Sequence, residues 1–367
     1  IIKTSAECDP PHDGPSKKKV MTLLDVSFSY FIQQVCSNPA LAITTLLTLG
    51  VIFVNGWTDA PNAIAGAVVT GALSFRRAVA LAAVCNFLGV LCVTAVYPSV
   101  VETIYSIAAF GGGPRAASLA LCAAMGAVVL WAAAAWWWGI PTSESHALAA
   151  GLSGAALALE GSLGCIRWQR WGAVLLGLVL SVAAGLWAGR QTERLTRRWP
   201  LSSKLFRLCQ IPGAAGTAFF HGAQDGQKFI GVFLLGSALA QGRQETQILR
   251  VPLWLMVLCA AAMAAGTALG GRRIIDTVGR EMVSLGPREG FSADLAGILC
   301  LLVATLLGLP VSTTHTRTAA LLGVGAAGPR GVDRRVVRSV LLAWLATFPG
   351  CMALGYGLAR AALARWS

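Results

Sequence analysis

Apolar runs separated by short polar connections repeat along the whole chain. The longest runs carry no charged residue and reach about the 20 residues that a helix needs to cross a bilayer. They lie at 26–58, 78–101, 116–143, 171–189, 251–271, 295–316 and 339–359, with shorter runs at 63–75, 229–241 and 321–328. This pattern predicts an all-α membrane protein with about 10–12 transmembrane or re-entrant helices.

The composition agrees with a chain that passes through a membrane many times. Hydrophobic residues make up 56% of the sequence and charged residues only 12%, which excludes one or two soluble domains. The net charge of +13 comes largely from arginines in the connections between apolar runs. Positive charge of this kind marks cytoplasmic connections. We therefore expect a multi-pass protein of the cell membrane, with the lipid bilayer and not nucleic acid as its partner.

The connections divide the chain into four parts. Residues 1–36 contain prolines and a lysine run, and we expect a flexible leader there. Residues 37–189 and 208–367 form two transmembrane repeats, joined by a basic cytoplasmic connection at 190–207. The ten cysteines never form a Cys-x-x-Cys pair, so we expect no cysteine metal site or disulfide.

A polar segment, here called the acid motif, interrupts the apolar pattern twice, at 56–66 and at 221–231. Each copy has an aspartate, Asp59 or Asp225, followed three residues later by a second polar residue, Asn62 or Lys228. A helix cap is the alternative explanation for each aspartate. Ionisable residues are costly inside a membrane and mark functional sites there, so the two copies predict a binding site.

A second repeated segment, the cap motif, has the form Pro-x-Ser-x-x-His and occupies 141–146 and 310–315. His146 lies 87 residues after Asp59, and His315 lies 90 residues after Asp225. Proline ends a helix, and the hydroxyl residues after it can cap the next one. Two motifs repeated in one order indicate two related halves, expected to be inverted, with broken helices facing a shared site for an anion.

Both motifs resemble those of the inorganic phosphate transporter (PiT) family, in its bacterial form. The family signature Gly-x-Asn/His-Asp-x-x-Asn is similar to 56–62 and 222–228, and segments at 277–279 and 290–293 also resemble the family. The resemblance implies a symporter that holds phosphate between the halves at the membrane midplane. By position, the implied phosphate ligands are Asp59, Asn62, Ser143, Ser145, Asp225, Lys228, Ser312, Thr313 and Thr314. The chain departs from the signature at Thr58, Gln224 and Lys228, and it has Glu144 where the family has a hydroxyl residue.

Asp59 and Asp225 would repel a phosphate anion unless cations bind with it. We therefore expect coupling to H⁺ or Na⁺, with Asp59, Asp225 and Glu144 as the coupling residues and a possible Na⁺ site near the two aspartates. We also expect Glu144 and Lys228 to pair across the site, with Lys228 replacing one sodium ion and protons as the coupling ion. His146 and His315 are assigned structural or gating roles. No cofactor, catalytic residue or other metal is expected.

Two other functions remain open at this point. A sulfate permease could use the same scaffold, because hydroxyls and helix N-termini recognise any tetrahedral oxyanion. An intramembrane serine hydrolase is more remote, since no Gly-x-Ser-x-Gly turn is present. A homodimer is compatible with the sequence.

Overall fold

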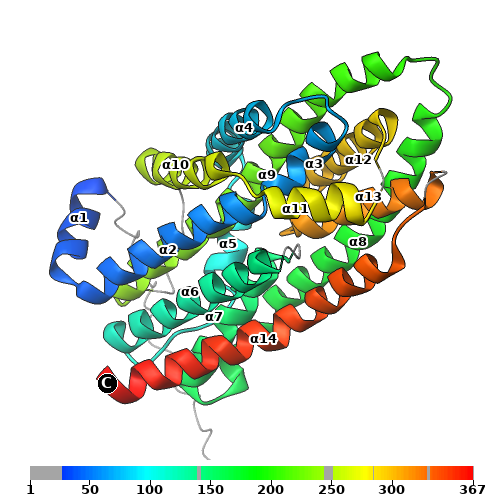
Figure 1. Cartoon of the computed structure of the whole chain (residues 1–367). Helices are drawn as coiled ribbons and strands as arrows, with labels where there is room; N and C mark the ends of the chain where they lie inside the picture. The colour runs from blue at the N-terminus through cyan, green and yellow to red at the C-terminus, as the bar shows by residue number, and fades with distance from the viewer. Residues whose placement is uncertain (1–26, 139–141, 244–250, 284, 329–330, 367) are drawn as a thin grey trace, which may run out of the picture.

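The structure is a computed structural model that describes residues 27–138, 142–243, 251–283, 285–328 and 331–366. All regular elements in these ranges are helical (Figure 1). The first half contains α1 (Phe28–Ser37), α2 (Pro39–Thr58), α3 (Pro61–Val69), α4 (Phe75–Val96), α5 (Ser99–Tyr105), α6 (Pro114–Trp137), α7 (Glu144–Glu160), the short 3-10 helix η1 (Leu163–Cys165) and α8 (Trp168–Thr196). The second half contains α9 (Ser203–Ala240), α10 (Leu253–Leu269), α11 (Arg272–Asp276), the π-helical turn η2 (Thr277–Glu281), α12 (Pro287–Leu306), α13 (Thr313–Ala327) and α14 (Arg334–Trp366).

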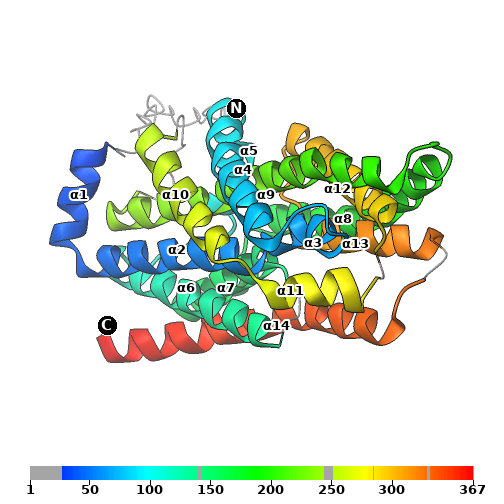
Figure 2. The same cartoon turned by 45° about the horizontal axis from the view of Figure 1, so that its top comes forward.

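The two halves follow the same order of elements and interlock. The pair α2 and α3 corresponds to α9, and the helices from α4 to α8 correspond to those from α10 to α14. Helix α4 packs on α9 of the other half, as α10 packs on α2; likewise α7 packs on α14 and α13 on α8 (Figure 2). Even the isolated β-bridges, Ala108 with Ile166 and Val283 with Val332, are in corresponding places. Helices of each half therefore pack against helices of the other half. The inverted orientation of the two halves stays a prediction.

Glycines in the acid motifs explain how these helices approach so closely. A Cβ atom on Gly56 would collide with the main chain of Met263 in α10, and one on Gly222 would collide with the main chain of Asn86 in α4. Small residues of this kind let membrane helices pack backbone to backbone. The same contact is thus made once by each half.

The helices differ in whether they are long enough to cross the hydrocarbon core of a membrane. Within the described residues, six helices are long and apolar enough to cross a membrane, with α2 and α3 taken as one, and α10 with α11 and η2 forms a further candidate bent by 68°. Helices α7 and α13 have only 17 and 15 residues. At 1.5 Å per residue they reach about 22–26 Å, less than the roughly 30 Å hydrocarbon core. We infer that each is the short arm of a re-entrant hairpin, with α6 or α12 as the long arm.

The start of the chain is more ordered than we expected. Residues 28–36 of the predicted flexible leader lie in α1, whose Phe31 packs with ring centroids 5.1 Å from Phe233 and from Trp254. The helix and this apolar contact correct the prediction for the last quarter of the leader. Residues 1–26 lie outside the described residues.

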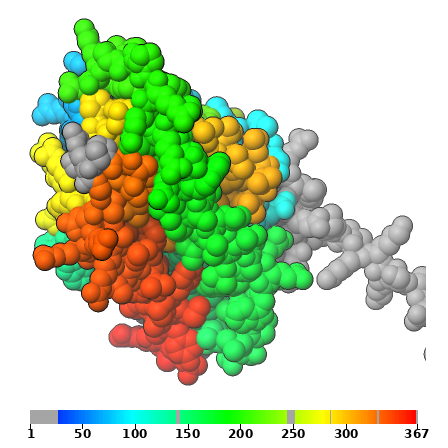
Figure 3. Space-filling view, turned by 90° about the vertical axis from the view of Figure 1, so that its right-hand side faces the viewer, coloured from blue at the N-terminus to red at the C-terminus, as the bar shows by residue number. Residues whose placement is uncertain are grey.

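The basic connection predicted at 190–207 lies at one end of the molecule. It consists of the last turns of α8, a link at 197–202 and the first turns of α9. Hydrogen bonds join this end to its neighbours: Gln210 of α9 accepts from Thr70, just after α3, and donates to the carbonyl of Pro287 at the start of α12. Figure 3 looks onto this end, with the green α8–α9 link and the orange start of α14 in view.

Candidate functional site

The two copies of the acid motif meet inside the protein, although their backbones differ. Helix α2 ends at Thr58 and α3 begins at Pro61, so Asp59 lies at a break, whereas Asp225 lies in the middle of the continuous helix α9. The hydroxyl of Thr313 donates to both carboxylates, at 3.2 Å to Asp59 and 3.0 Å to Asp225. Both aspartates are at most 3% exposed. The predicted convergence of the two acids is therefore present in the structure.

Each aspartate also has a partner from its own motif, three residues later. The amide of Asn62 donates to Asp59 at 2.7 Å. The ammonium of Lys228 donates to Asp225 at 2.6 Å. The hydroxyl of Thr314 adds a further contact to Asp59. The three-residue spacing noted in the sequence thus places acid and partner in contact in both copies, across the helix break in the first and on one face of α9 in the second.

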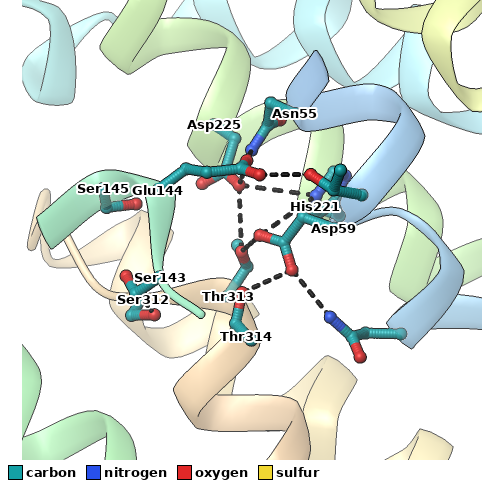
Figure 4. Close-up of polar contacts among 12 residues, drawn as sticks. Asn55, Asp59, Ser143, Glu144, Ser145, His221, Asp225, Ser312, Thr313 and Thr314 are labelled. Atoms are coloured by element: carbon teal, nitrogen blue, oxygen red, sulfur yellow. Dashed lines mark hydrogen bonds and ion pairs between the residues drawn. The ribbon is translucent and has the colours of Figure 1, made fainter. Parts of the chain in front are cut away.

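Glu144, the first residue of α7, adds a third carboxylate to the same cluster (Figure 4). It accepts hydrogen bonds from the amide of Asn55 and the hydroxyl of Thr58. The Asn55 amide also lies 3.3 Å from Asp225, so Asn55 bridges the two acids.

The predicted pair between Glu144 and Lys228 is wrong. The Lys228 ammonium is instead surrounded by Asp225, the hydroxyl of Ser145 and the carbonyl of Val311, each at 2.6 Å. The acid three residues earlier on the same helix is closer than Glu144, whose oxygens are already taken by two donors of α2. The lysine is 1% exposed.

The cap motifs place two helix N-termini against each other. Ser143 caps α7 by accepting from the N–H of His146, and Ser312 caps α13 by accepting from the N–H of His315. The predicted helix breaks and serine caps are thus confirmed. The two cap hydroxyls also bond to each other, at 2.8 Å. Helix N-termini carry free N–H groups and partial positive charge, so this meeting point favours an anion.

His221 belongs to the site but was not identified from the sequence. Its Nε2 atom lies 3.4 Å from Asp225 and 3.7 Å from Asp59, and its Nδ1 atom pairs with Asn86 at 2.9 Å. Ligand atoms of Asp59, His221 and Asp225 all lie within 4.8 Å of one another, close enough to share a cation. Asn55 and His221 each precede the motif aspartate by four residues, one helical turn, and this shared spacing was the available signal.

The rings of His146 and His315 pack against each other and against aromatic side chains of α14, outside the acid cluster. Their ring centroids are 4.7 Å apart, His146 packs against Phe348, and His315 stacks on Trp344 at 3.7 Å. Neither histidine ring is paired with the three carboxylates in the described structure. Their assignment to structural or gating roles stays a prediction.

A second missed feature is a buried ion pair beside the site. Arg317 of α13 and Asp294 of α12 lie 2.7 Å apart, and Arg317 also donates to the carbonyls of Ala293 and Asn62. Both side chains are almost fully buried. The pair ties the start of α3, which carries Asn62, to the second re-entrant hairpin.

Comparison with known proteins gives three concordant results. Residues 55–355 match the model of the phosphate transporter family. Proteins named "probable low-affinity inorganic phosphate transporter" from Bacillus subtilis and Rhizobium meliloti are 34% and 36% identical, over 85% and 81% of this chain and 94% and 89% of their own. A solved structure titled "The sodium-dependent phosphate transporter" is similar in fold, with a TM-score of 0.79 and 21% identity, and the match covers 90% of this chain and all of that one.

Proposed function

This chain belongs to the phosphate transporter family, and we propose that it imports inorganic phosphate across the cell membrane together with cations. It is a multi-pass membrane transporter and not an enzyme, which removes the serine hydrolase from consideration. One observation carries the proposal. Two helix N-termini, one from each half, meet at a cluster of buried carboxylates. Such a site offers an anion and a cation adjoining positions.

The anion side is formed by the first turns of α7 and α13. Ser143 and Ser312 cap the two helices, and Ser145, Thr313 and Thr314 add hydroxyls in the same turns. Free N–H groups at helix N-termini bind phosphate readily. A phosphate held here would receive donors from both halves, so a change in either half would affect its binding.

The cation side follows from the charges. Asp59, Glu144 and Asp225 bring three acidic groups together, and the basic groups beside them are the ammonium of Lys228 and the imidazole of His221. Two unit charges about 4 Å apart interact by roughly 4 kcal/mol at an effective dielectric constant near 20. A phosphate anion would meet this repulsion unless cations bound with it. H⁺ on a carboxylate, or Na⁺ among Asp59, Asp225 and backbone carbonyls near the α2–α3 break, would remove it.

The carboxylates also favour phosphate over sulfate. Near neutral pH phosphate keeps one or two protons and can donate hydrogen bonds, whereas sulfate has none to donate. Ionised carboxylates only accept hydrogen bonds. A sulfate ion next to Asp59 or Asp225 would leave acceptor facing acceptor, and sites of this kind discriminate strongly against ligands that lack the donor.

The burial of the site implies alternating access. The side chains of Asp59, Glu144, Asp225 and Lys228 are at most 3% exposed. Phosphate therefore reaches them only after the helices move. Because the halves interlock through α4 with α9 and α10 with α2, movement of the re-entrant hairpins against these packed pairs is the simplest opening.

Positive charge at one end of the helices supports an orientation of the protein in the membrane, with that end in the cytoplasm. The end that holds the α8–α9 link carries Arg190, Arg194, Arg197, Arg198, Lys204 and Arg207, and it also holds Arg288, which pairs with Glu193 of α8. Positive charge concentrates on the cytoplasmic side of membrane proteins. We place this end in the cytoplasm.

Reconstitution in proteoliposomes tests the function. We expect labelled phosphate to accumulate above its outside concentration when a proton or sodium gradient is directed inward, and to stop accumulating when an ionophore collapses that gradient. Excess sulfate should leave uptake nearly unchanged. Uptake that sulfate blocks as well as unlabelled phosphate does would establish the sulfate permease instead. Equilibration without accumulation would reject symport.

A further inference from the structure

Lys228 is the most confined charged side chain of the site. Its ammonium group donates at 2.6 Å to a carboxylate oxygen of Asp225, the hydroxyl of Ser145 and the main-chain carbonyl of Val311. These three oxygens come from α9, α7 and the segment before α13. A lysine ammonium has three N–H donors. All three are used, so none is left to bind phosphate in this arrangement.

The three oxygens form the kind of ligand set that holds a small cation. Carboxylate, hydroxyl and carbonyl oxygens are the ligands of hard cations, and carbonyls of unwound segments hold Na⁺ in transporters with broken helices. Val311 lies in such a segment, between the end of α12 and the start of α13. The ammonium group occupies the place that a dissociable cation would otherwise take.

The other half shows what the site is like without the lysine. Asn62 corresponds to Lys228, and its amide contacts Asp59 at 2.7 Å as Lys228 contacts Asp225 at 2.6 Å. The amide is neutral, so it adds no positive charge beside Asp59. The two repeats thus make the same side-chain contact to the aspartate, once with and once without a built-in positive charge.

We propose that Lys228 is a tethered coupling cation, which replaces one dissociable cation in the transport cycle. This inference rests on the proposed phosphate symport. A lysine cannot leave the protein, so it neutralises Asp225 in every conformation in which the contact persists and carries no charge across the membrane. The chain therefore needs one cation fewer per phosphate than the same chain with a neutral residue at position 228.

The direct test is K228N, which gives the second half the residue of the first. The number of cations moved per phosphate is obtained from the gradient at which net phosphate flux in proteoliposomes is zero, with proton and sodium gradients varied separately. We expect this number to rise by one in K228N. At low sodium and high pH, uptake by K228N should fall by at least about tenfold and recover as cation concentration rises, since cation and phosphate binding are coupled.

Two further variants complete the experiment. The reciprocal variant N62K adds a tethered cation beside Asp59, and the number of cations per phosphate should fall by one. K204N, which removes an exposed lysine in the first turn of α9, should leave that number unchanged. If the K228N protein cannot be recovered from the membrane, the number of cations per phosphate measured for N62K tests the proposal by itself.

The outcomes separate this inference from the proposed function. Failure of the wild-type protein to exchange phosphate for phosphate would reject the function before any variant is made. With exchange intact, an unchanged cation number in K228N, or a K228N protein that is folded but inactive at every cation concentration, would overturn the role of Lys228. An unchanged number in N62K would overturn it when K228N is not recovered.

Discussion

The two copies of the acid motif occupy equivalent places, yet they carry different charges. In the first half, Asp59 is joined by a second acid, Glu144, and by the neutral Asn62. In the second half, Asp225 is joined by Lys228, and Thr313 stands where the first half has Glu144. The first half thus contributes two acids, and the second contributes an acid already paired with a base. We propose from this comparison that the halves share the phosphate but divide the handling of cations unequally.

The backbones differ for a reason that the sequence shows. The first copy has Pro61 where the second has Gln227. Proline has no N–H, and its ring collides with the carbonyl four residues earlier, so α2 ends and α3 starts anew. Helix α9 has no proline in its motif and continues through it. The broken copy therefore has the end of one helix and the start of another beside Asp59, where the continuous copy has neither. Broken helices of this kind hold dissociable cations in transporters.

Neutralising the aspartates should give the largest effects and should also separate the halves. We expect D59N and D225N each to reduce phosphate accumulation to the level of empty liposomes, because Asp59 is needed to bind a dissociable cation and Asp225 is needed to hold the Lys228 ammonium. Only D225N leaves a buried lysine without its carboxylate, which costs about 3–5 kcal/mol. Thermal unfolding in detergent should therefore show a lower melting temperature for D225N than for D59N.

The double variant D225N/K228N is the control for this difference. It removes both charges of the pair, and the melting temperature should return most of the way to the wild-type value. Equal melting temperatures for D59N and D225N would show that the Lys228 contact does not distinguish the halves.

Glu144 is the acid that has no counterpart in the second half, and E144Q should have the next largest effect. We expect E144Q to lose accumulation driven by a proton gradient while it still exchanges phosphate for phosphate. Glutamine keeps an oxygen that can accept from Asn55 or Thr58, but it has no carboxyl group to take up or release a proton. Proton-driven accumulation by E144Q at the wild-type rate would remove Glu144 from coupling.

The caps should give smaller and equal effects. S143A and S312A each remove one helix cap, worth about 0.5–2 kcal/mol, from the two helices that face the anion. We expect a rise of a few-fold in the KM for phosphate in each variant, with little change in maximal rate. A large effect in one variant and none in the other would show that a single half binds the phosphate.

The side of the membrane on which the α8–α9 link lies can be tested with a variant that should hardly affect transport. Ser202 lies in the exposed link before α9. A cysteine there should react with an impermeant reagent only after the cells are opened, with the parent chain as the control for its own cysteines. Labelling of intact cells from outside would reverse the orientation.

Much of the candidate site could be predicted from the sequence because both of its motifs occur twice along the chain. Asp59 and Asp225 were identified from their shared frame, and the caps Ser143 and Ser312 from the proline ahead of them. Asn55 and His221 escaped attention, although they repeat one turn earlier in both copies. Repetition was therefore more informative than charge alone.

The hydrogen-bond and ion-pair partners that lie far apart in the sequence could not be predicted from it. Glu144 pairs with Asn55 and Thr58, which lie more than 80 residues away, and only the packing of α7 near α2 brings them together. Charged residues Asp294 and Arg317 bound an apolar run predicted at 295–316, and the turn of a hairpin places them opposite each other. Such contacts depend on the geometry of the hairpin, which the hydrophobic pattern does not contain.

Binding of phosphate to the purified protein tests most directly whether this acidic site takes an anion only together with cations. Calorimetric titration with phosphate would be carried out over a range of sodium concentrations at fixed pH, and then over a range of pH without sodium. We predict that the Kd for phosphate falls as one of the two cations becomes more abundant, after correction for the protonation of phosphate itself. A Kd that stays the same across both series would contradict cation-coupled binding at Asp59, Glu144 and Asp225.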